Sequence, residues 1–307
     1  MQIDQLGIHD SVRAVFPPEQ LREALSGNGP EVRVVSGEGI GDCEAVVTFA
    51  YEESLLECEW IHSIQAGYDR FPLSELEERE VVLTNSTGIH GDSVGETGVG
   101  YMLMLARRLG QYARQQERKE WDRPAWDVPF TLAGESVCVV GLGTLGQGIA
   151  RRASALGMDV TGVRRSGEPV EGVERVYPSE ELHEAISGAR FVALAVPLTD
   201  ETEGLLSEAE LGVMREDGYL INVSRGGVVD QDALVTGLES GAIRGAALDV
   251  FETEPLPKES PLWGMEEVLV TPHAAAYTRG YYEAIGELVE GNLARLETGD
   301  EFENRVV

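Results

Sequence analysis

The sequence has few of the features that mark secreted, metal-binding or membrane proteins. Among 307 residues there are only three cysteines, Cys43, Cys58 and Cys138, and their spacing matches no metal or redox motif. No apolar run approaches the ~20 residues that span a bilayer. The first residues also lack the basic and apolar parts of a secretory signal. We therefore predict a cytoplasmic protein with reduced thiols, no metal site and no membrane partner.

Basic residues are also scarce. The chain has 24 Lys and Arg against 54 Asp and Glu, which gives a net charge of −30, and only Lys119 and Lys258 are lysines. Nucleic acid is excluded as a partner because neutralising phosphates requires excess cations. The acidic residues are spread along predicted helices, where they repel one another unless salt screens them. Glutamate-rich, lysine-poor surfaces of this kind resemble those of halophilic proteins, so we expect a salt-requiring fold.

Short apolar runs alternate with helical patterns along most of the chain, which predicts an α/β fold. The first ~95 residues form the first of these alternating regions. A long amphipathic pattern, which predicts a helix, starts at Glu96. The carboxylate of Glu96 suits the positive end of the helix dipole. Strands then recur at 137–140, 159–163, 191–196, 219–223, 244–249 and 267–271. We predict two doubly wound parallel sheets. One belongs to a Rossmann dinucleotide-binding domain over 98–281, and the other to a smaller flavodoxin-like substrate domain over 1–97 plus 282–307.

A glycine-rich turn is the most informative motif. Gly141, Gly143 and Gly146 have G-x-G-x-x-G spacing between an apolar strand and a helical pattern. In that context the glycines allow a tight turn and close backbone approach, while the N–H groups at the helix start, near Thr144 and Leu145, favour a pyrophosphate. The motif predicts a dinucleotide site. An ordinary α/β turn and a methyltransferase-type loop are the alternatives.

Three chemically useful side chains each follow a predicted strand. They are Arg225, Glu254 and His273. Because the carboxyl ends of parallel strands surround the ligand crevice, these side chains are expected to converge. A guanidinium binds carboxylate and carbonyl oxygens, an imidazole can deliver a proton to a developing alkoxide, and a nearby carboxylate favours the protonated ring. Taken singly, each also occurs as a surface ion-pair residue, a solvated charge or a polar strand end.

Seven segments occur in order along almost the whole chain. They are Gln65-Ala-Gly67-Tyr-Asp69, Gly95-Glu96-Thr, the glycine turn, Pro197-Leu-Thr199-x-x-Thr202, Asn222-Val-Ser-Arg225-Gly, Asp249-Val-Phe-x-x-Glu254-Pro and Thr271-Pro-His273. With these segments the chain resembles the D-isomer-specific 2-hydroxyacid dehydrogenase family. The resemblance implies that Arg225 binds and polarises the substrate, that Glu254 orients His273 and that His273 is the acid/base.

The resemblance also implies where substrate and cofactor bind. Backbone N–H groups of Ala66 and Gly67 would bind the substrate carboxylate, Arg225 and His273 would also contact the substrate, and Asp249 would hold the nicotinamide carboxamide. The remaining cofactor contacts would come from the glycine turn and from Val196, Pro197, Thr202, Val223, Ser224, Arg225, His273 and Ala275.

The second strand of the nucleotide-binding repeat indicates which nicotinamide is used. Arg164, Arg165 and Ser166 follow it where an NAD enzyme usually has an acidic residue, and Asp159 is at the opposite end. Two guanidiniums and a hydroxyl suit a 2′-phosphate, so NADP(H) is preferred and NAD(H) remains possible. A pair of solvated arginines is the alternative.

We therefore predict an NADPH-dependent D-2-hydroxyacid dehydrogenase that reduces small 2-oxo acids to D-2-hydroxy acids. Phe49, Ala50 and Tyr51 are candidates for discriminating among substrates. The extended helix and the segment to Trp126 resemble the dimer arm of the family, so a homodimer is expected. A nucleotide-sensing binding module of the same fold and a phosphoglycerate-type dehydrogenase are the alternatives.

Overall fold

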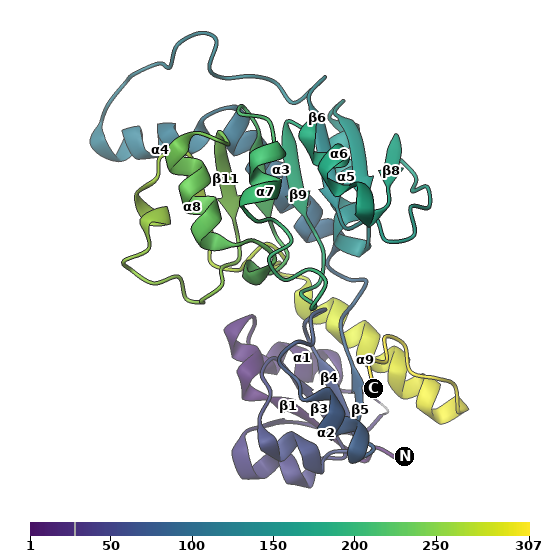
Figure 1. The fold of residues 1–307 in the computed structure, drawn as a ribbon. Helices are drawn as coiled ribbons and strands as arrows, with labels where there is room; N and C mark the ends of the chain where they lie inside the picture. The colour runs from purple at the N-terminus through teal and green to yellow at the C-terminus, as the bar shows by residue number, and fades with distance from the viewer. Residues whose placement is uncertain (28) are drawn as a thin grey trace. The chain divides into compact units, whose positions relative to one another are not determined.

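Parallel β-sheets form the centre of both units into which the chain divides (Figure 1). The computed structural model describes residues 1–27 and 29–307. Unit 1 comprises Met1–His90 and Tyr277–Val307, and unit 2 comprises Gly91–Ala276. The domain boundaries expected at 97/98 and 281/282 lie a few residues later in the chain and stay a prediction. The α/β class with two parallel sheets is confirmed.

Unit 1 is built from β1 (Gln5–His9), α1 (Pro18–Ala24), β2 (Glu31–Val35), β3 (Ala45–Thr48), β4 (Trp60–Ser63), α2 (Leu73–Glu78), β5 (Val82–Thr84) and α9 (Tyr281–Thr298), with the 3-10 helices η1 (Asp10–Ala14), η2 (Gly37–Asp42) and η3 (Glu53–Glu57). The sheet order is β2-β1-β3-β4-β5, with all neighbouring strands parallel. Helices α1 and α9 pack on one face through Leu21, Ile285 and Val289. Leu76 of α2 packs on the other.

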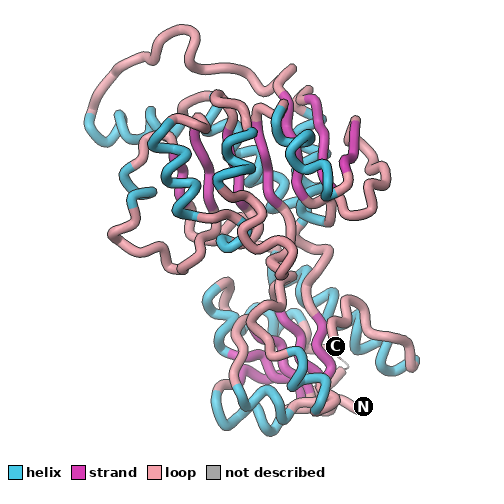
Figure 2. Tube along the Cα trace, viewed as in Figure 1, coloured by secondary structure: helices cyan, strands magenta, loops and turns pink. Residues whose placement is uncertain are grey.

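Unit 2 contains α3 (Gly91–Ala106), α4 (Leu109–Arg118), β6 (Ser136–Val140), α5 (Thr144–Ala155), β7 (Asp159–Val163), β8 (Arg175–Tyr177), η4 (Ser179–Glu181), α6 (Leu182–Ser187), β9 (Phe191–Leu194), α7 (Glu208–Val213), β10 (Tyr219–Asn222), η5 (Gly226–Val228), α8 (Gln231–Ser240), β11 (Gly245–Leu248), η6 (Pro261–Gly264) and β12 (Val268–Val270). Its seven strands are parallel, in the order β12-β11-β10-β9-β6-β7-β8. Figure 2 shows these strands as a layer with helices on both sides.

Both faces of the unit 2 sheet are buried. Successive side chains of a strand point to opposite faces, and each face belongs to its own apolar cluster. Along β6, Cys138 and Val140 belong to one apolar cluster, and Val137 and Val139 belong to the other. Cys138 is therefore a buried core residue, and burial raises the pKa of its thiol to about 12. None of the helices in the described part of the chain is both long and apolar enough to cross a bilayer.

The expected role of Glu96 as a helix-start carboxylate is wrong. Helix α3 begins at Gly91, so Asp92 is the acidic residue of its first turn. The dipole effect fades beyond that turn, and the Glu96 carboxylate lies instead 3.6 Å from the guanidinium of Arg152. The long helical pattern is also interrupted, because Arg108 adopts a left-handed backbone conformation with φ of 57° between α3 and α4.

Two strands have no counterpart in the sequence-based prediction. Strand β1 includes Gly7, which lowers its strand propensity, yet a Cβ at Gly7 would meet the Val35 side chain at 2.8 Å. Close packing between strands therefore requires the glycine. Strand β8 is a short edge strand whose residues are only partly buried or exposed, so it carries a weak apolar pattern.

Candidate active site and dinucleotide site

The glycine motif forms the turn between β6 and α5. Gly141 has φ of +94°, and a Cβ there would meet a backbone carbonyl oxygen at 2.6 Å. Gly146 packs directly against the carbonyl of Gly141, so neither position accepts a side chain. Gly143 instead borders open space, with no heavy atom within 4 Å of an added Cβ. The N–H groups of Thr144 and Leu145, at the start of α5, lack acceptors within the helix, as a pyrophosphate site requires.

The segment 164–166 lies beside this glycine turn. Strands β6 and β7 pair in register, and the N–H of Gly141 donates to the carbonyl of Val163 at 3.0 Å. Asp159 pairs with Ser136 at the other end of the same strands. The carboxylate of Asp159 is therefore at the edge of the sheet away from the turn, whereas Arg164 follows the strand at the near edge.

The two arginines of this segment differ in their surroundings. A guanidinium nitrogen of Arg164 lies 3.9 Å from a carboxylate oxygen of Glu168, an exposed and therefore weak ion pair. Arg165 is exposed, and among residues 1–27 and 29–307 it makes no hydrogen bond or ion pair. Ser166 accepts a hydrogen bond from the N–H of Glu168 at 3.4 Å. Arg165 can therefore bind an added anion without breaking an existing contact.

The other predicted cofactor contacts lie on loops at the same sheet edge. The strand order reverses between β9 and β6, next to the glycine turn, which is the switch point at which open parallel sheets bind dinucleotides. From β7 to β11 there are four inter-strand spacings of ~4.8 Å, or roughly 19 Å, a span that an extended dinucleotide can cross. The loops after β9, β10 and β12 contribute Val196, Pro197, Thr202, Val223, Ser224 and Ala275.

Asp249 is a buried carboxylate at the end of β11 and is 1% exposed. Its Oδ1 accepts hydrogen bonds from the hydroxyl of Thr271 (2.6 Å) and the N–H of Ala274 (3.0 Å). The hydroxyl of Tyr101 shares its proton between this oxygen, at 3.1 Å, and the Thr271 hydroxyl, at 2.6 Å. Oδ2 of Asp249 accepts one hydrogen bond, from the N–H of Ala275 at 2.8 Å. A carboxylate offers about four acceptor positions, two on each oxygen, so Oδ2 can still accept the N–H of a carboxamide.

His273 and Glu254 form a close pair at the end of β12 and β11. The Nδ1 of His273 lies 2.7 Å from Oε2 of Glu254, and Oε1 of Glu254 accepts the N–H of Phe251 at 3.1 Å. Both side chains are about 70% buried, being 28% and 29% exposed. The carboxylate therefore fixes the orientation of the ring by accepting a hydrogen bond from Nδ1–H, which leaves Nε2 to face a ligand.

The backbone of His273 is strained. Its φ is 53°, in the left-handed region that residues with a side chain seldom adopt. The N–H of His273 donates to the carbonyl of Asp249 at 2.8 Å, so the buried loop that carries Asp249 holds the strained conformation. Strain of this kind costs roughly 1–3 kcal/mol and persists where the surrounding structure enforces it, often at functional sites.

Arg225 follows β10, which lies next to β11. Asn222 aligns with Leu248 across these strands, so the loops after them start side by side. The buried amide of Asn222 donates to the carbonyl of Arg225 at 3.0 Å, and Oδ1 of Asn222 accepts both the N–H and the hydroxyl of Ser224. At Gly226 an added Cβ would collide with the backbone of Phe251, so the arginine loop packs directly on the loop that carries Glu254.

Three of the other histidines occupy environments unlike that of His273. Burial lowers the pKa of His62 to about 3 and that of His90 to about 4, so both rings are neutral near pH 7. His183 forms a second histidine–glutamate pair, 2.8 Å from Glu210. Burial opposes ionisation of Glu210, but hydrogen bonds from His183 and Ser207 lower its pKa to about 2. That carboxylate also caps α7, so the pair has a structural explanation.

The loop of Ala66 and Gly67 follows β4 in unit 1. The amide of Asn85 donates to the carbonyl of Ala66 at 2.6 Å, and the N–H of Ser86 donates to that of Gln65 at 3.1 Å. Across the described residues, neither Ala66 nor Gly67 donates its own N–H to an acceptor. These two donors are therefore oriented by their neighbours and available to an anion.

Three residues that build this site had no predicted role. Tyr101 of α3 is buried, and burial raises the pKa of its phenol, so it remains a donor to Asp249. Thr271 donates to the same carboxylate, and Asn222 orders the arginine loop. Tyr101 looks like one more apolar residue at helical spacing, so the sequence gives no sign of its hydrogen bond. No group of three or more His, Cys, Asp or Glu side chains in the described residues could hold a metal ion.

Comparison with known proteins identifies the family. Residues 99–275 match the family model described as the NAD binding domain of D-isomer specific 2-hydroxyacid dehydrogenases. A glyoxylate reductase of Korarchaeum cryptofilum is 33% identical over 88% of this chain and 85% of its own length. The chain belongs to the D-isomer specific 2-hydroxyacid dehydrogenase family. A D-3-phosphoglycerate dehydrogenase of Methanocaldococcus jannaschii is 34% identical over 78% of this chain, which spans about half of that protein (46%).

Solved structures of the family have the same fold. An NADPH-dependent glyoxylate/hydroxypyruvate reductase from Sinorhizobium meliloti, in complex with NADP and sulfate, is similar with a TM-score of 0.83, 27% identity and coverage of 99% of this chain and 98% of that one. A D-isomer specific 2-hydroxyacid dehydrogenase from Xanthobacter autotrophicus, in complex with NADPH and MES, has a TM-score of 0.81, 28% identity and coverage of 99% and 98%.

Proposed function

We propose that this protein reduces small 2-oxo acids to D-2-hydroxy acids with NADPH. The observation that carries the proposal is the pairing of His273 with Glu254 at 2.7 Å, on the sheet edge that also bears the glycine turn and Arg225. Glyoxylate reductases among the relatives support a small 2-oxo acid as substrate. The test is an assay of several 2-oxo acids with NADPH and with NADH, at high salt, followed by chiral analysis of the product.

Each side chain has a defined task in this reaction. Arg225 binds the carboxylate and polarises the carbonyl of the substrate. In unit 1, the N–H groups of Ala66 and Gly67 are the proposed donors to a carboxylate. His273 donates its Nε2 proton to the carbonyl oxygen as that oxygen gains negative charge, and Glu254 stabilises the charged ring and holds its orientation. The bound nicotinamide supplies the hydride. Asp249 orients that ring through its carboxamide.

Preference for NADPH over NADH is part of the proposal. We assign this preference to Arg165, because the residue is exposed beside the glycine turn and its guanidinium has no partner among the described residues. Arg164 and Ser166 would complete a 2′-phosphate site, and NADH remains a possible weaker cofactor. The NADP(H) complexes of the two similar structures support this choice.

An Arg165→Ala variant tests the cofactor preference. A hydrogen bond to a charged group contributes about 1.5–3 kcal/mol, and exposure favours the lower value. We therefore expect kcat/KM for NADPH to fall about tenfold, while kcat/KM for NADH stays the same. Arg22→Ala, which removes an exposed arginine from α1 in unit 1, is the control for the change in net charge. Equal losses with both cofactors would exclude Arg165 from phosphate recognition.

Oxidation of D-3-phosphoglycerate is a second candidate activity, favoured by the similarity to the phosphoglycerate dehydrogenase of M. jannaschii. The two activities are separated by measuring oxidation of D-3-phosphoglycerate with NAD⁺ and NADP⁺ beside reduction of glyoxylate. If D-3-phosphoglycerate is turned over faster than glyoxylate at equal concentration, the proposed substrate class is wrong and the protein is a phosphoglycerate-type dehydrogenase.

We also propose a homodimer that buries the segment after α4. Trp121 and Trp126 are 90% and 93% exposed in the single chain, and Leu109 and Tyr112 of α4 are exposed as well. Large apolar side chains exposed together mark interaction surfaces. Light scattering after gel filtration should give twice the mass of the chain, and Trp126→Glu should give the monomer. A monomeric wild-type protein would contradict the proposal.

A further inference from the structure

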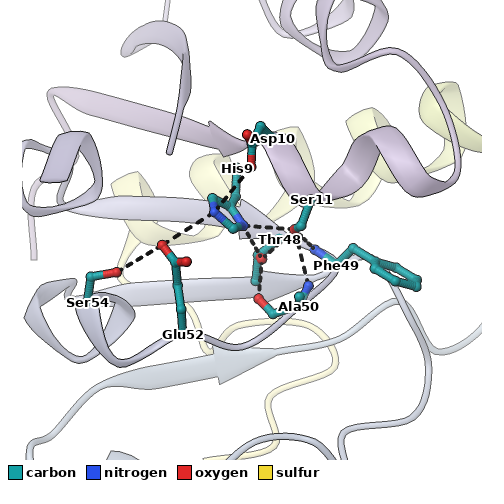
Figure 3. A network of polar contacts seen from close by, with 8 residues as sticks. All are labelled: His9, Asp10, Ser11, Thr48, Phe49, Ala50, Glu52 and Ser54. Atoms are coloured by element: carbon teal, nitrogen blue, oxygen red, sulfur yellow. Dashed lines mark hydrogen bonds and ion pairs between the residues drawn. The ribbon is translucent and has the colours of Figure 1, made fainter. Parts of the chain in front are cut away.

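A polar network occupies the switch point of the unit 1 sheet. The order β2-β1-β3-β4-β5 reverses direction at β1 and β3, and a ligand crevice in an open parallel sheet forms at the carboxyl ends of such strands. His9 is the last residue of β1, and Thr48 is the last residue of β3. Figure 3 shows their side chains meeting Ser11 at this point, beside the backbone of Phe49 and Ala50.

Ser11 is the centre of the network. Its Oγ accepts the N–H groups of Phe49 at 3.1 Å and Ala50 at 3.2 Å, which uses both lone pairs of the hydroxyl. The Ser11 proton must then be donated. Nδ1 of His9 is the nearer acceptor at 2.8 Å, while Oγ1 of Thr48 is 3.2 Å away. Thr48 itself donates to the carbonyl of Ala50 at 2.5 Å.

This arrangement assigns the proton of the His9 ring to Nε2, because Nδ1 acts as an acceptor. Nε2 lies 3.5 Å from Oδ1 of Asp10 and 3.4 Å from Oε1 of Glu52. His9 is 5% exposed, so the ring is held on both sides within the fold. One histidine thereby links the turn after β1 to the segment after β3.

The segment 49–51 is also held from the other side. The guanidinium of Arg70 lies 5.3 Å from the centre of the Phe49 ring, and the Tyr51 ring packs edge-on against Phe71 at 6.0 Å. Arg70 is on the loop after β4 that also carries Ala66 and Gly67. The segment 49–51 thus contacts two loops, the turn that carries Ser11 and the loop that carries the proposed donors to the substrate carboxylate.

We propose that Ser11 and His9 are positioning residues that hold the segment 49–51 as the wall against which the substituent of the 2-oxo acid packs. This inference rests on the proposed function. Ser11 fixes the backbone of Phe49 and Ala50, and His9 fixes Ser11. Glyoxylate has only a hydrogen at that position and does not reach the wall. Larger 2-oxo acids place a methyl, hydroxymethyl or branched group against it, so the network determines selectivity among substrates.

The test measures selectivity in Ser11→Ala at saturating NADPH. The readout is the ratio of kcat/KM for pyruvate, hydroxypyruvate and 2-oxoisocaproate to that for glyoxylate. A hydrophobic contact of one methylene discriminates about 10- to 200-fold. We expect the ratio for the best substituted acid to fall about tenfold, mainly through KM. Ser11→Thr, which keeps the hydroxyl, should restore most of the ratio.

Ser54→Ala is the matched control, because within the described part of the chain the hydroxyl of Ser54 donates only to Glu52, at the outer end of the network. Its selectivity should equal that of the wild-type protein. A Ser11→Ala variant that keeps the ratio, or that loses all substrates equally, overturns the inference. Wild-type protein that reduces no 2-oxo acid overturns the proposed function instead. If Ser11→Ala does not fold, the same ratio is measured in two variants of His9. His9→Asn keeps a hydrogen-bond acceptor for Ser11 and should keep the wild-type ratio. His9→Leu has no acceptor, and its ratio should fall as expected for Ser11→Ala.

Discussion

Replacement of His273 by glutamine is expected to lower kcat for 2-oxo acid reduction about 10²- to 10⁴-fold, the usual contribution of a positioned general acid. Glutamine can still hydrogen bond to a carbonyl oxygen but cannot transfer a proton to it. The cofactor contacts of the glycine turn are unchanged, so the affinity for NADPH, measured by fluorescence titration, should stay within a few-fold of the wild-type value. Stopped-flow or steady-state NADPH oxidation gives kcat.

The chain contains its own control for this experiment. His183 and Glu210 are 2.8 Å apart, almost the separation of His273 and Glu254, but they lie on α6 and α7. His183→Gln should therefore leave kcat unaltered. Glu254→Gln should reduce kcat less than His273→Gln does, because the proton donor is still present but less well oriented. If the wild-type protein has only weak activity and His273→Gln has the same kcat, the alternative of a nucleotide-sensing binding module is favoured.

A residue of this site could be predicted from the sequence when its position follows from the order of strands, turns and helices. It could not be predicted when its role depends on a contact with a residue far away in the sequence. The glycine turn was predictable because strand, glycines and helix are contiguous in the sequence. His273, Glu254 and Arg225 were predictable as a group because parallel strands bring their carboxyl ends to one edge. The register of β10, β11 and β12 places the starts of their loops side by side, as that rule requires.

The supporting contacts could not be predicted in this way. The hydrogen bond from Tyr101 to Asp249 joins residues separated by 148 positions, and the contact of Ser11 with Phe49 spans 38. Each depends on the angle at which an element packs, which composition and periodicity do not encode. The left-handed backbone of His273 is likewise imposed by the loop that carries Asp249. The sequence therefore identifies the chemical groups, and the packing determines how firmly they are held.

Raising KCl from 0.1 M to 3 M is expected to stabilise the folded protein strongly. The net charge of −30 arises from acidic residues on many elements, including Glu287 and Glu290 on the exposed side of α9. If ten pairs of like charges each cost about 0.2–0.5 kcal/mol, screening recovers roughly 2–5 kcal/mol. That corresponds to a rise in Tm of roughly 3–8 °C for a protein of this size. Differential scanning calorimetry across the salt series measures it.

Two features separate charge screening from a general effect of concentrated salt on apolar burial. The screening length is about 10 Å at 0.1 M and 3 Å at 1 M, so most of the rise should occur below 1 M. A Glu287→Lys/Glu290→Lys variant should also raise Tm at 0.1 M and have a smaller effect at 3 M, because it removes repulsion that salt otherwise screens. Equal Tm at 0.1 M and 3 M KCl would show that the acidic surface is not a salt-requiring one, and a rise confined to 1–3 M would assign the effect to apolar burial instead.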